Sequence, residues 1–303
     1  MKKILITGSN GLIGRTISGY FKSFPEYHLT GLSSGENRNS SLSEFIRADI
    51  SDSFSLSAAL KKAGPDIIIH TAAMGSPDMC EQNRVDAWKI NVEATSIISD
   101  YCRLNRIFLQ HWSTDFVFDG LKGNYIETDE PNPVSYYGLT KLESEKVVAD
   151  RYPDACIFRT ILVYGLFPVM TRHNVLSRVL MAGESNSKMN IAADQFRTPT
   201  YVLDLASATK LAIDKNAKGV YHVSGCDYLS VYDFVLKVAS VFGINSSLFK
   251  PVSSYDLSEK AKRPPRTGFV LDKARSELGY KPSGIVDSLE EIKNLAETEA
   301  TNS

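Results

Sequence analysis

Short apolar runs alternate with longer segments of helical periodicity along the first half of the chain. "KILIT" (Lys3–Thr7) and the β-branched run "PDIIIH" (Pro65–His70) have the continuous apolar character of strands buried on both faces, as in parallel sheets. "SFSLSAALKKAG" instead repeats apolar residues at helical spacing and ends at Gly64. Further strands are expected at His28–Leu32, Glu44–Ala48, Ile107–Ser113 and Cys156–Thr160, and helices at Gly11 to about Phe21, at about Asn83 to Leu104 and around Tyr137. This alternation predicts an α/β fold with a doubly wound parallel sheet.

The alternation becomes less regular after Thr160. A helix is expected from about Val202, a strand at Gly219–Gly225, and a further helix with Ser230 as its N-cap and Asp233 in the capping-box position. "KRPPRTGFVLD" is too irregular for the centre of a sheet. We therefore predict a first domain over residues 1–163, whose sheet is completed by about 190–224, and a smaller interleaved C-terminal lobe formed mainly by 164–189 and 225–303.

Composition and charge describe an ordinary soluble globular protein. Hydrophobic residues make up 43% of the 303 residues and charged residues 23%, and a net charge of -1 gives no reason to expect nucleic acid or an anionic membrane as a partner. The four cysteines lie far apart without a C-x-x-C pair, which favours reduced thiols, and no His/Cys/Asp cluster has metal-ligand spacing. The start is too short for a signal peptide, and no run of about 18 apolar residues follows. We expect a cytoplasmic protein without a metal.

A glycine-rich segment, "TGSNGLIG", follows the first strand and opens the first helix. Gly8, Gly11 and Gly14 form the G-x-x-G-x-x-G variant of the dinucleotide fingerprint. Without Cβ atoms, the backbone amides at the helix N-terminus can approach a pyrophosphate. Residues 1–163 are therefore predicted to be a dinucleotide-binding domain.

The segment after the second strand bears on the choice of cofactor. An NAD-specific fold usually has an acid here for the ribose 2′-hydroxyl, whereas "GLSSGENR" supplies Ser33, Ser34 and Arg38, with Glu36 as the only acid nearby. Hydroxyls and a cation favour a 2′-phosphate, so NADP(H) is predicted in preference to NAD(H). Asp49 and Ile50, in "ADI", are expected to flank the adenine.

"YYGLTK" places Tyr137 and Lys141 at i and i+4, on one face of a helix. A phenol pKa of about 10 must fall by about 3 units, or about 4 kcal/mol, for proton exchange near neutrality. One positive charge at about 4 Å in an effective dielectric of about 20 supplies about 4 kcal/mol. Tyr137 is therefore a candidate proton donor and Lys141 its pKa-lowering partner, with the Thr114 hydroxyl available to hold a substrate oxygen.

Five segments together resemble the extended short-chain dehydrogenase/reductases over roughly residues 1–280: "TGSNGLIG", "HTAA", "STDFVFDG", "YYGLTK" and "FRTPTYVLDLA". The most similar branch is that of dTDP-4-dehydrorhamnose reductase. The resemblance implies a Rossmann fold and a catalytic triad of Thr114, Tyr137 and Lys141, in which Tyr137 protonates the C4 carbonyl oxygen of a nucleotide-linked keto sugar and Lys141 also binds the nicotinamide ribose. It also implies a possible homodimer. The residues expected at the cofactor are Gly8, Asn10, Gly11, Leu12, Ile13, Gly14, Ser33, Arg38, Asp49, Ile50, Ala72, Ala73, Asn91, Tyr137 and Lys141.

Other readings stay open within this resemblance. Phe116 stands where nucleotide-sugar dehydratases carry a second acid, which favours a reductase, whereas Leu162 replaces the tryptophan usual in rhamnose reductases. Arg263 and Arg266 are candidates for a nucleotide diphosphate. The alternatives are a nucleotide-sugar epimerase and a non-catalytic NADP-binding regulatory subunit, since the regulatory β subunit of methionine adenosyltransferase resembles the same branch and such relatives can keep Tyr-x-x-x-Lys.

Overall fold

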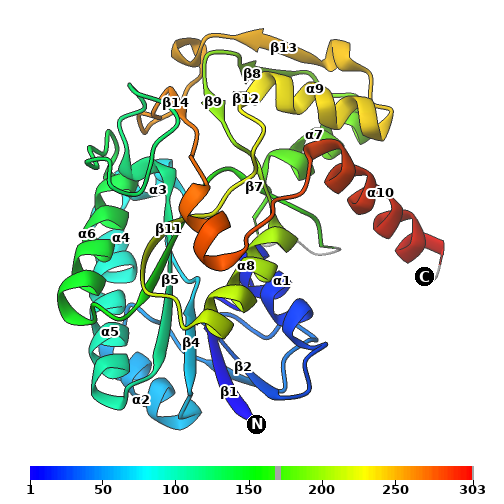
Figure 1. Cartoon of the computed structure of the whole chain (residues 1–303). Helices are drawn as coiled ribbons and strands as arrows, with labels where there is room; N and C mark the ends of the chain where they lie inside the picture. Colours follow the sequence, from blue (N-terminus) through cyan, green and yellow to red (C-terminus); the bar gives the residue numbers. More distant parts are fainter. Residues whose placement is uncertain (168–171, 302–303) are drawn as a thin grey trace.

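A seven-stranded parallel sheet forms the centre of the molecule (Figure 1). The structure is a computed structural model of the chain and describes residues 1–167 and 172–301. The strands, in the order in which they lie in the sheet, are β11 (Gly219–His222), β6 (Cys156–Thr160), β5 (Phe108–Thr114), β4 (Ile67–His70), β1 (Lys2–Thr7), β2 (Tyr27–Ser33) and β3 (Glu44–Arg47). The strand order reverses at β1 and β4, which makes their carboxyl ends the place where ligands bind in such sheets. The predicted doubly wound α/β fold is confirmed.

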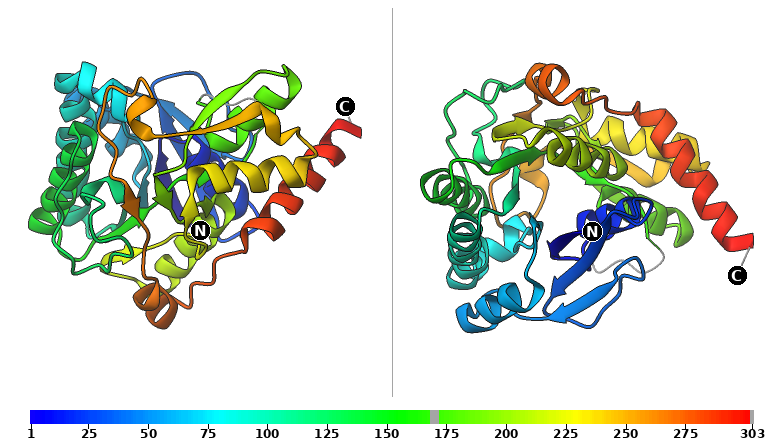
Figure 2. Two further views of the ribbon diagram at one scale, coloured as in Figure 1. Left: turned by 90° about the horizontal axis from the view of Figure 1, so that it is seen from above. Right: turned by 60° about the horizontal axis from the view of Figure 1, so that its bottom comes forward.

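Helices cover both faces of the sheet (Figure 2). One face packs against α1 (Leu12–Phe21) and α8 (Val202–Lys215), and the other against α2 (Ser53–Ala63), α5 (Ala94–Asn105) and α6 (Tyr136–Arg151). Strand β1 contributes side chains to the apolar clusters on both faces of the sheet. Ile4 and Ile6 pack on the side of α1 and α8, and Leu5 packs on the side of α2 and α5. This two-sided burial explains why β1 is continuously apolar.

The prediction of a single helix from about Asn83 to Leu104 is wrong in detail, because several shorter elements occupy this region. The chain forms α3 (Pro77–Gln82), α4 (Arg84–Trp88), a π-helical turn over Lys89–Glu93, and then α5. Asn91 lies in the π turn, and its carboxamide accepts from the Met74 amide (2.8 Å) and donates to Thr140 Oγ1 (2.9 Å). The extra residue of a π turn redirects a side chain, and here it aims Asn91 at the loop after β4.

The C-terminal lobe lies over the carboxyl ends of the central strands (Figure 1). Its helices are α7 (Val175–Glu184), α9 (Val231–Phe242) and α10 (Ile285–Thr301), and the Ser230 hydroxyl caps α9 as predicted by accepting from the Asp233 amide. Of the segment 190–224, only β11 joins the central sheet. The remaining strands form three small sheets: β8 (Met189–Ala192) with β13 (Phe249–Val252), β9 (Phe196–Arg197) with β12 (Leu229–Ser230) and β14 (Arg266–Thr267), and β7 (Val163–Tyr164) with β10 (Thr200–Tyr201). Short 3-10 turns at Asp115–Val117, Ser246–Leu248 and Ser254–Asp256 and a π turn at Ala274–Leu278 complete the elements.

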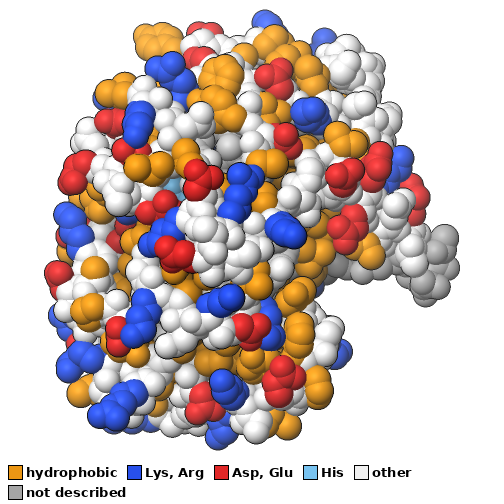
Figure 3. All heavy atoms as spheres, viewed as in Figure 1, with side chains coloured by type: hydrophobic (Ala, Val, Ile, Leu, Met, Phe, Trp, Pro, Cys, Tyr) orange, Lys and Arg blue, Asp and Glu red, His pale blue; other side chains and the backbone are white. Residues whose placement is uncertain are grey.

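The surface seen in Figure 3 carries interspersed positive and negative side chains rather than one extended patch of either sign. This distribution agrees with the near-zero net charge of the chain. Among the described residues, no helix is both long and apolar enough to cross a membrane.

Candidate active site

The turn between β1 and α1 is built for close backbone approach. Gly8 has φ +68°, and a Cβ there would lie 2.8 Å from the Ala72 Cα. A Cβ on Gly14 would lie 2.5 Å from the Gly8 carbonyl oxygen. Helix α1 begins after Gly11 without a side-chain cap, so the amides of its first turn are left for a ligand. A tight glycine turn that ends at a free helix N-terminus fits the pyrophosphate of a dinucleotide.

Asn10 connects this turn to the loop that follows β2. Its side-chain oxygen accepts from the Arg38 amide (2.9 Å), and its side-chain nitrogen donates to the Glu36 carbonyl (2.7 Å). The Ser33 hydroxyl accepts from the Asn10 amide at 3.3 Å. Ser33 and the exposed Arg38 are thereby held beside the glycine turn, as a contact with the adenosine ribose requires.

A cavity of about 1060 Å³ runs from the glycine turn to the C-terminal lobe. Lys141 and Arg197 line it from the two sides. The structure brings ten of the predicted site residues to this cavity: Gly8, Asn10, Gly11, Leu12, Ile13, Gly14, Ala73, Thr114, Tyr137 and Lys141.

The other predicted cofactor residues lie outside the lining of the cavity. The Asp49 carboxylate accepts from the amide and hydroxyl of Ser51, and Ile50 is buried in the core. Ala72 packs under Gly8. Asn91 is buried and supports the backbone at Met74, so its place in the structure is behind the cavity wall.

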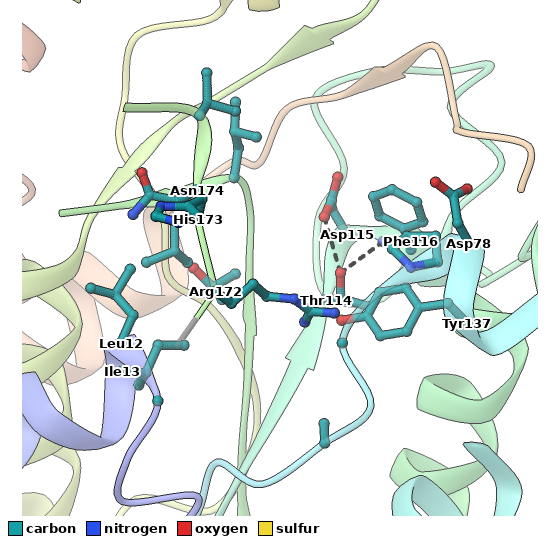
Figure 4. Close-up of a pocket in the computed structure, with 18 of the residues that line it drawn as sticks. Leu12, Ile13, Asp78, Thr114, Asp115, Phe116, Tyr137, Arg172, His173 and Asn174 are labelled. Atoms are coloured by element: carbon teal, nitrogen blue, oxygen red, sulfur yellow. Dashed lines mark hydrogen bonds between the residues drawn. The ribbon is translucent and has the colours of Figure 1, made fainter. Parts of the chain in front are cut away.

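Tyr137 reaches Thr114 because α6 starts in close contact with the end of β5. The Ser135 hydroxyl caps α6 by accepting from the Gly138 amide (3.2 Å). A Cβ on Gly138 would lie 2.1 Å from the Phe116 carbonyl oxygen, so this position needs glycine. The Thr114 hydroxyl donates to Asp115 Oδ1 (3.1 Å) and accepts from the Phe116 amide (3.3 Å), as Figure 4 shows.

The electrostatics of the phenol differ from the expectation. Desolvation raises the pKa of Tyr137 to about 12, opposed by a hydrogen bond with Thr114 and by the charge of Arg172. Lys141, for which we expected the pKa-lowering role, lies with its Nζ 3.3 Å from His111 Nε2. Burial lowers the pKa of Lys141 itself to about 8. The buried position of this lysine, 3% exposed, is the cause.

Two further residues of the site were not identified from the sequence. Arg172 extends its guanidinium towards the hydroxyl of Tyr137 (Figure 4), and it comes from a loop for which periodicity gives no signal. Asp115 is buried, which raises its pKa, and its Oδ2 lies 3.5 Å from Arg197 Nε and accepts from the Thr267 hydroxyl (2.5 Å). Its place in "STD", beside Thr114, was the available signal.

The two arginines expected at a diphosphate have partners within the protein. Arg263 pairs with Asp78 (3.1 Å) and Glu259 (2.6 Å), and Arg266 donates to the Leu121 carbonyl (3.3 Å). Leu162 lines the cavity with φ +38°, a backbone conformation that is unusual for a branched side chain. Within residues 1–167 and 172–301, no group of three or more His, Cys, Asp or Glu is placed to hold a metal.

The glycine turn at the switch point and the Thr114, Tyr137 and Lys141 side chains at the same sheet edge define an NAD(P)H-dependent oxidoreductase of the extended short-chain dehydrogenase/reductase type. The family profile described as RmlD substrate binding domain matches residues 1–296. The chain belongs to this family.

Relatives and solved structures agree with this assignment. A dTDP-4-dehydrorhamnose reductase of Aggregatibacter actinomycetemcomitans is 29% identical over 309 residues, which cover 98% of this chain and all of that protein. The β subunit of methionine adenosyltransferase 2 of Bos taurus is 31% identical over 257 residues, 83% of this chain and 75% of that protein. The crystal structure of a Bacillus anthracis dTDP-4-dehydrorhamnose reductase in complex with NADP superposes with a TM-score of 0.84 at 25% identity, over 97% of this chain and 99% of that chain.

Proposed function

We propose that this protein reduces the C4 carbonyl of a nucleotide-linked 4-keto-deoxyhexose with NADPH. The observation that carries the proposal is that Thr114, Tyr137 and Lys141 open onto the same cavity as the glycine turn. A cofactor on the turn and a sugar under the lobe would therefore meet at the Tyr137 hydroxyl.

Each side chain has one task in this reaction. Thr114 donates to the carbonyl oxygen and orients it, and Tyr137 transfers its hydroxyl proton to that oxygen. The hydride for the carbonyl carbon would come from NADPH bound on the glycine turn. Lys141 would hold the nicotinamide ribose, and Arg172 contributes the positive charge that lowers the pKa of Tyr137.

Three residues near the site indicate which reaction is catalysed and which cofactor is bound. Phe116, in the place of a second acid, favours reduction over dehydration, because the elimination of water needs a further proton-transfer group. Ser33 and Arg38 favour a 2′-phosphate and so NADPH, and the relative from Bacillus anthracis was crystallised with NADP. The two reductase relatives support dTDP as the nucleotide.

The test is NADPH oxidation by the purified protein with a panel of dTDP- and GDP-linked 4-keto sugars. Steady oxidation that is lost in Tyr137→Phe supports the proposal, whereas isomerisation of the sugar without net oxidation indicates an epimerase. A lower Michaelis constant for NADH than for NADPH would contradict the role given to Ser33 and Arg38.

A second candidate function is a regulatory subunit that binds NADP without turnover. The 31% identity to the β subunit of bovine methionine adenosyltransferase 2 favours it. NADPH binding without oxidation on any sugar, together with a change in the activity of a purified methionine adenosyltransferase on mixing, would decide for this function.

A further inference from the structure

We propose that His111 is a positioning residue for Lys141: a neutral, buried hydrogen-bond acceptor that fixes the lysine Nζ at the cavity wall. This inference rests on the proposed function, because it concerns the lysine of the proposed triad. His111 lies on β5, three residues before Thr114, and its Nε2 is 3.3 Å from Lys141 Nζ. Both side chains are almost fully buried.

The imidazole has the protonation state that such an acceptor needs. Burial, reinforced by the charges of Lys141 and His70, holds the pKa of His111 well below its ordinary range, so the ring is neutral at physiological pH. The Nε2 atom lies 3.3 Å from the Lys141 ammonium and 2.9 Å from the Ser144 hydroxyl, whose own proton is donated to the Lys141 carbonyl (2.7 Å). Only an unprotonated Nε2 can accept from the ammonium, so the proposed role requires the tautomer with its proton on Nδ1.

That tautomer has an energetic cost, because its Nδ1–H donor is buried and has no hydrogen-bond partner among the described residues. A buried unsatisfied donor costs roughly 1–3 kcal/mol. In the proposed role, the contact between Nε2 and the Lys141 ammonium offsets this cost.

A neutral acceptor suits Lys141 better than a charged one. The titratable groups that shift the pKa of Lys141 are Glu145 on its own helix and Cys80 on α3, and the charge of Lys141 in turn lowers the pKa values of His70 and His111 on the sheet. Glu145 raises the lysine pKa, yet its carboxylate is bound by Arg159 (2.7 Å), and burial prevails, with a pKa of about 8. A carboxylate in place of His111 would bring the lysine pKa back towards its ordinary value.

Three variants test whether Lys141 needs a neutral acceptor at this position. His111→Gln keeps a neutral acceptor, His111→Leu removes the acceptor at similar volume, and His111→Glu adds a charge. The Lys141 pKa is read from the ¹³Cε resonances of ¹³C-labelled lysine, assigned with Lys141→Met. The exposed Lys146 on the same helix serves as an internal reference. We expect the Lys141 pKa to stay within about half a unit in His111→Gln and to rise by about one unit or more in His111→Glu.

The alkaline limit of kcat/KM should move with the same pKa. If His111→Leu does not fold, the glutamine and glutamate variants still decide. An unchanged Lys141 pKa in the glutamate variant would overturn the inference. Because the lysine titration needs no substrate, absence of turnover on every sugar would contradict the proposed function without touching the role of His111.

Discussion

Lys141 illustrates, at the scale of the residue, how a functional side chain costs stability. Its folded pKa of about 8 lies below the unfolded value of 10.5. Between these values the unfolded chain binds a proton that the folded chain lacks, so stability rises with pH across this window. Below about pH 8 the lysine is charged in both states, and the full desolvation penalty is present.

Replacing Lys141 by methionine should therefore stabilise the protein at neutral pH while abolishing activity. The expected gain in the free energy of unfolding is roughly 3 kcal/mol at pH 7, decreasing towards zero near pH 10.5. Urea denaturation at the two pH values measures it, with Lys146→Met, exposed on the same helix, as the control. A gain that does not depend on pH would mean that the charge of Lys141 is not the cause.

Arg172 is the second residue whose charge matters, because its cation lowers the pKa of Tyr137, the proposed proton donor. Arg172→Met should lower kcat by up to about tenfold, the equivalent of about one pKa unit. Arg172→Lys should retain most of the rate. Equal single-turnover rate constants for the wild type and Arg172→Met would show that the charge of Arg172 does not assist proton donation by Tyr137.

Helix α6 carries Tyr137 and Lys141, the proposed catalytic groups, and it is fixed to the sheet through buried polar contacts. Glu145 accepts from Arg159 on β6 through Nε (3.0 Å) and Nη2 (2.7 Å), and also from the Ser113 hydroxyl on β5. These bonds hold the polar side of α6 against the strands, while Val148 supplies an apolar contact. The position of Tyr137 relative to Thr114 depends on this attachment.

Breaking the pair on one side only should be severe. Glu145→Leu leaves the Arg159 guanidinium buried without its partner, which costs roughly 3–5 kcal/mol. The double variant Glu145→Leu/Arg159→Met should recover much of that loss, because both charges are removed. Chemical denaturation of the two single variants and the double variant gives the coupling energy. A coupling within about 0.5 kcal/mol of zero would show that the pair does not hold α6.

Gly138 lies in the first turn of α6, where the helix approaches the end of β5. Gly138→Ala forces a Cβ against the Phe116 carbonyl, so the start of α6 must move and Tyr137 with it. We expect a destabilisation of roughly 1–3 kcal/mol and a larger fall in kcat than in NADPH affinity. Steady-state kinetics gives kcat, and fluorescence titration gives the NADPH dissociation constant. An unchanged kcat would contradict the close approach of Gly138 to the Phe116 carbonyl.

At the scale of the whole molecule, the loop that ends at Arg263 contacts α3 at the edge of the cavity. Asp78 at the start of α3 accepts from the amides of Lys260 (3.2 Å) and Ala261 (3.0 Å) and pairs with Arg263. The loop before it contributes Leu257, Ser258 and Glu259 to the cavity wall. The Asp78 carboxylate on α3 therefore helps to hold this part of the wall, together with the Glu259 carboxylate that also pairs with Arg263.

Asp78→Ala should loosen the substrate side and leave the cofactor side unchanged. Losing these bonds at a partly exposed site costs about 1 kcal/mol, which corresponds to a roughly fivefold higher KM for the nucleotide sugar. Asp86→Ala, on the exposed side of α4, is the control. A rise in the NADPH dissociation constant of the same size would show that Asp78 does not act through the lobe.

The sequence predicted what depends on local pattern: the alternating elements, the glycine turn and the shared face of Tyr137 and Lys141. It did not predict the π turn at Asn91, because the reason for it is a tertiary bond to Met74 and Thr140. The direction of Lys141 towards His111 was also missed, since burial decides it rather than spacing. The lobe was the hardest part, because its two-residue strands carry little periodicity.

The central claim is that hydride from the cofactor and a proton from Tyr137 reach one carbonyl in this cavity. The most direct measurement is NADPH deuterated at C4 of the nicotinamide ring, incubated with a dTDP-4-keto-deoxyhexose, with the product analysed by NMR. We expect one deuterium on C4 of the sugar, formed with a single stereochemistry and absent with Tyr137→Phe. Bound NADPH that transfers no deuterium to any keto sugar, or transfer that persists at full rate in Tyr137→Phe, would contradict it.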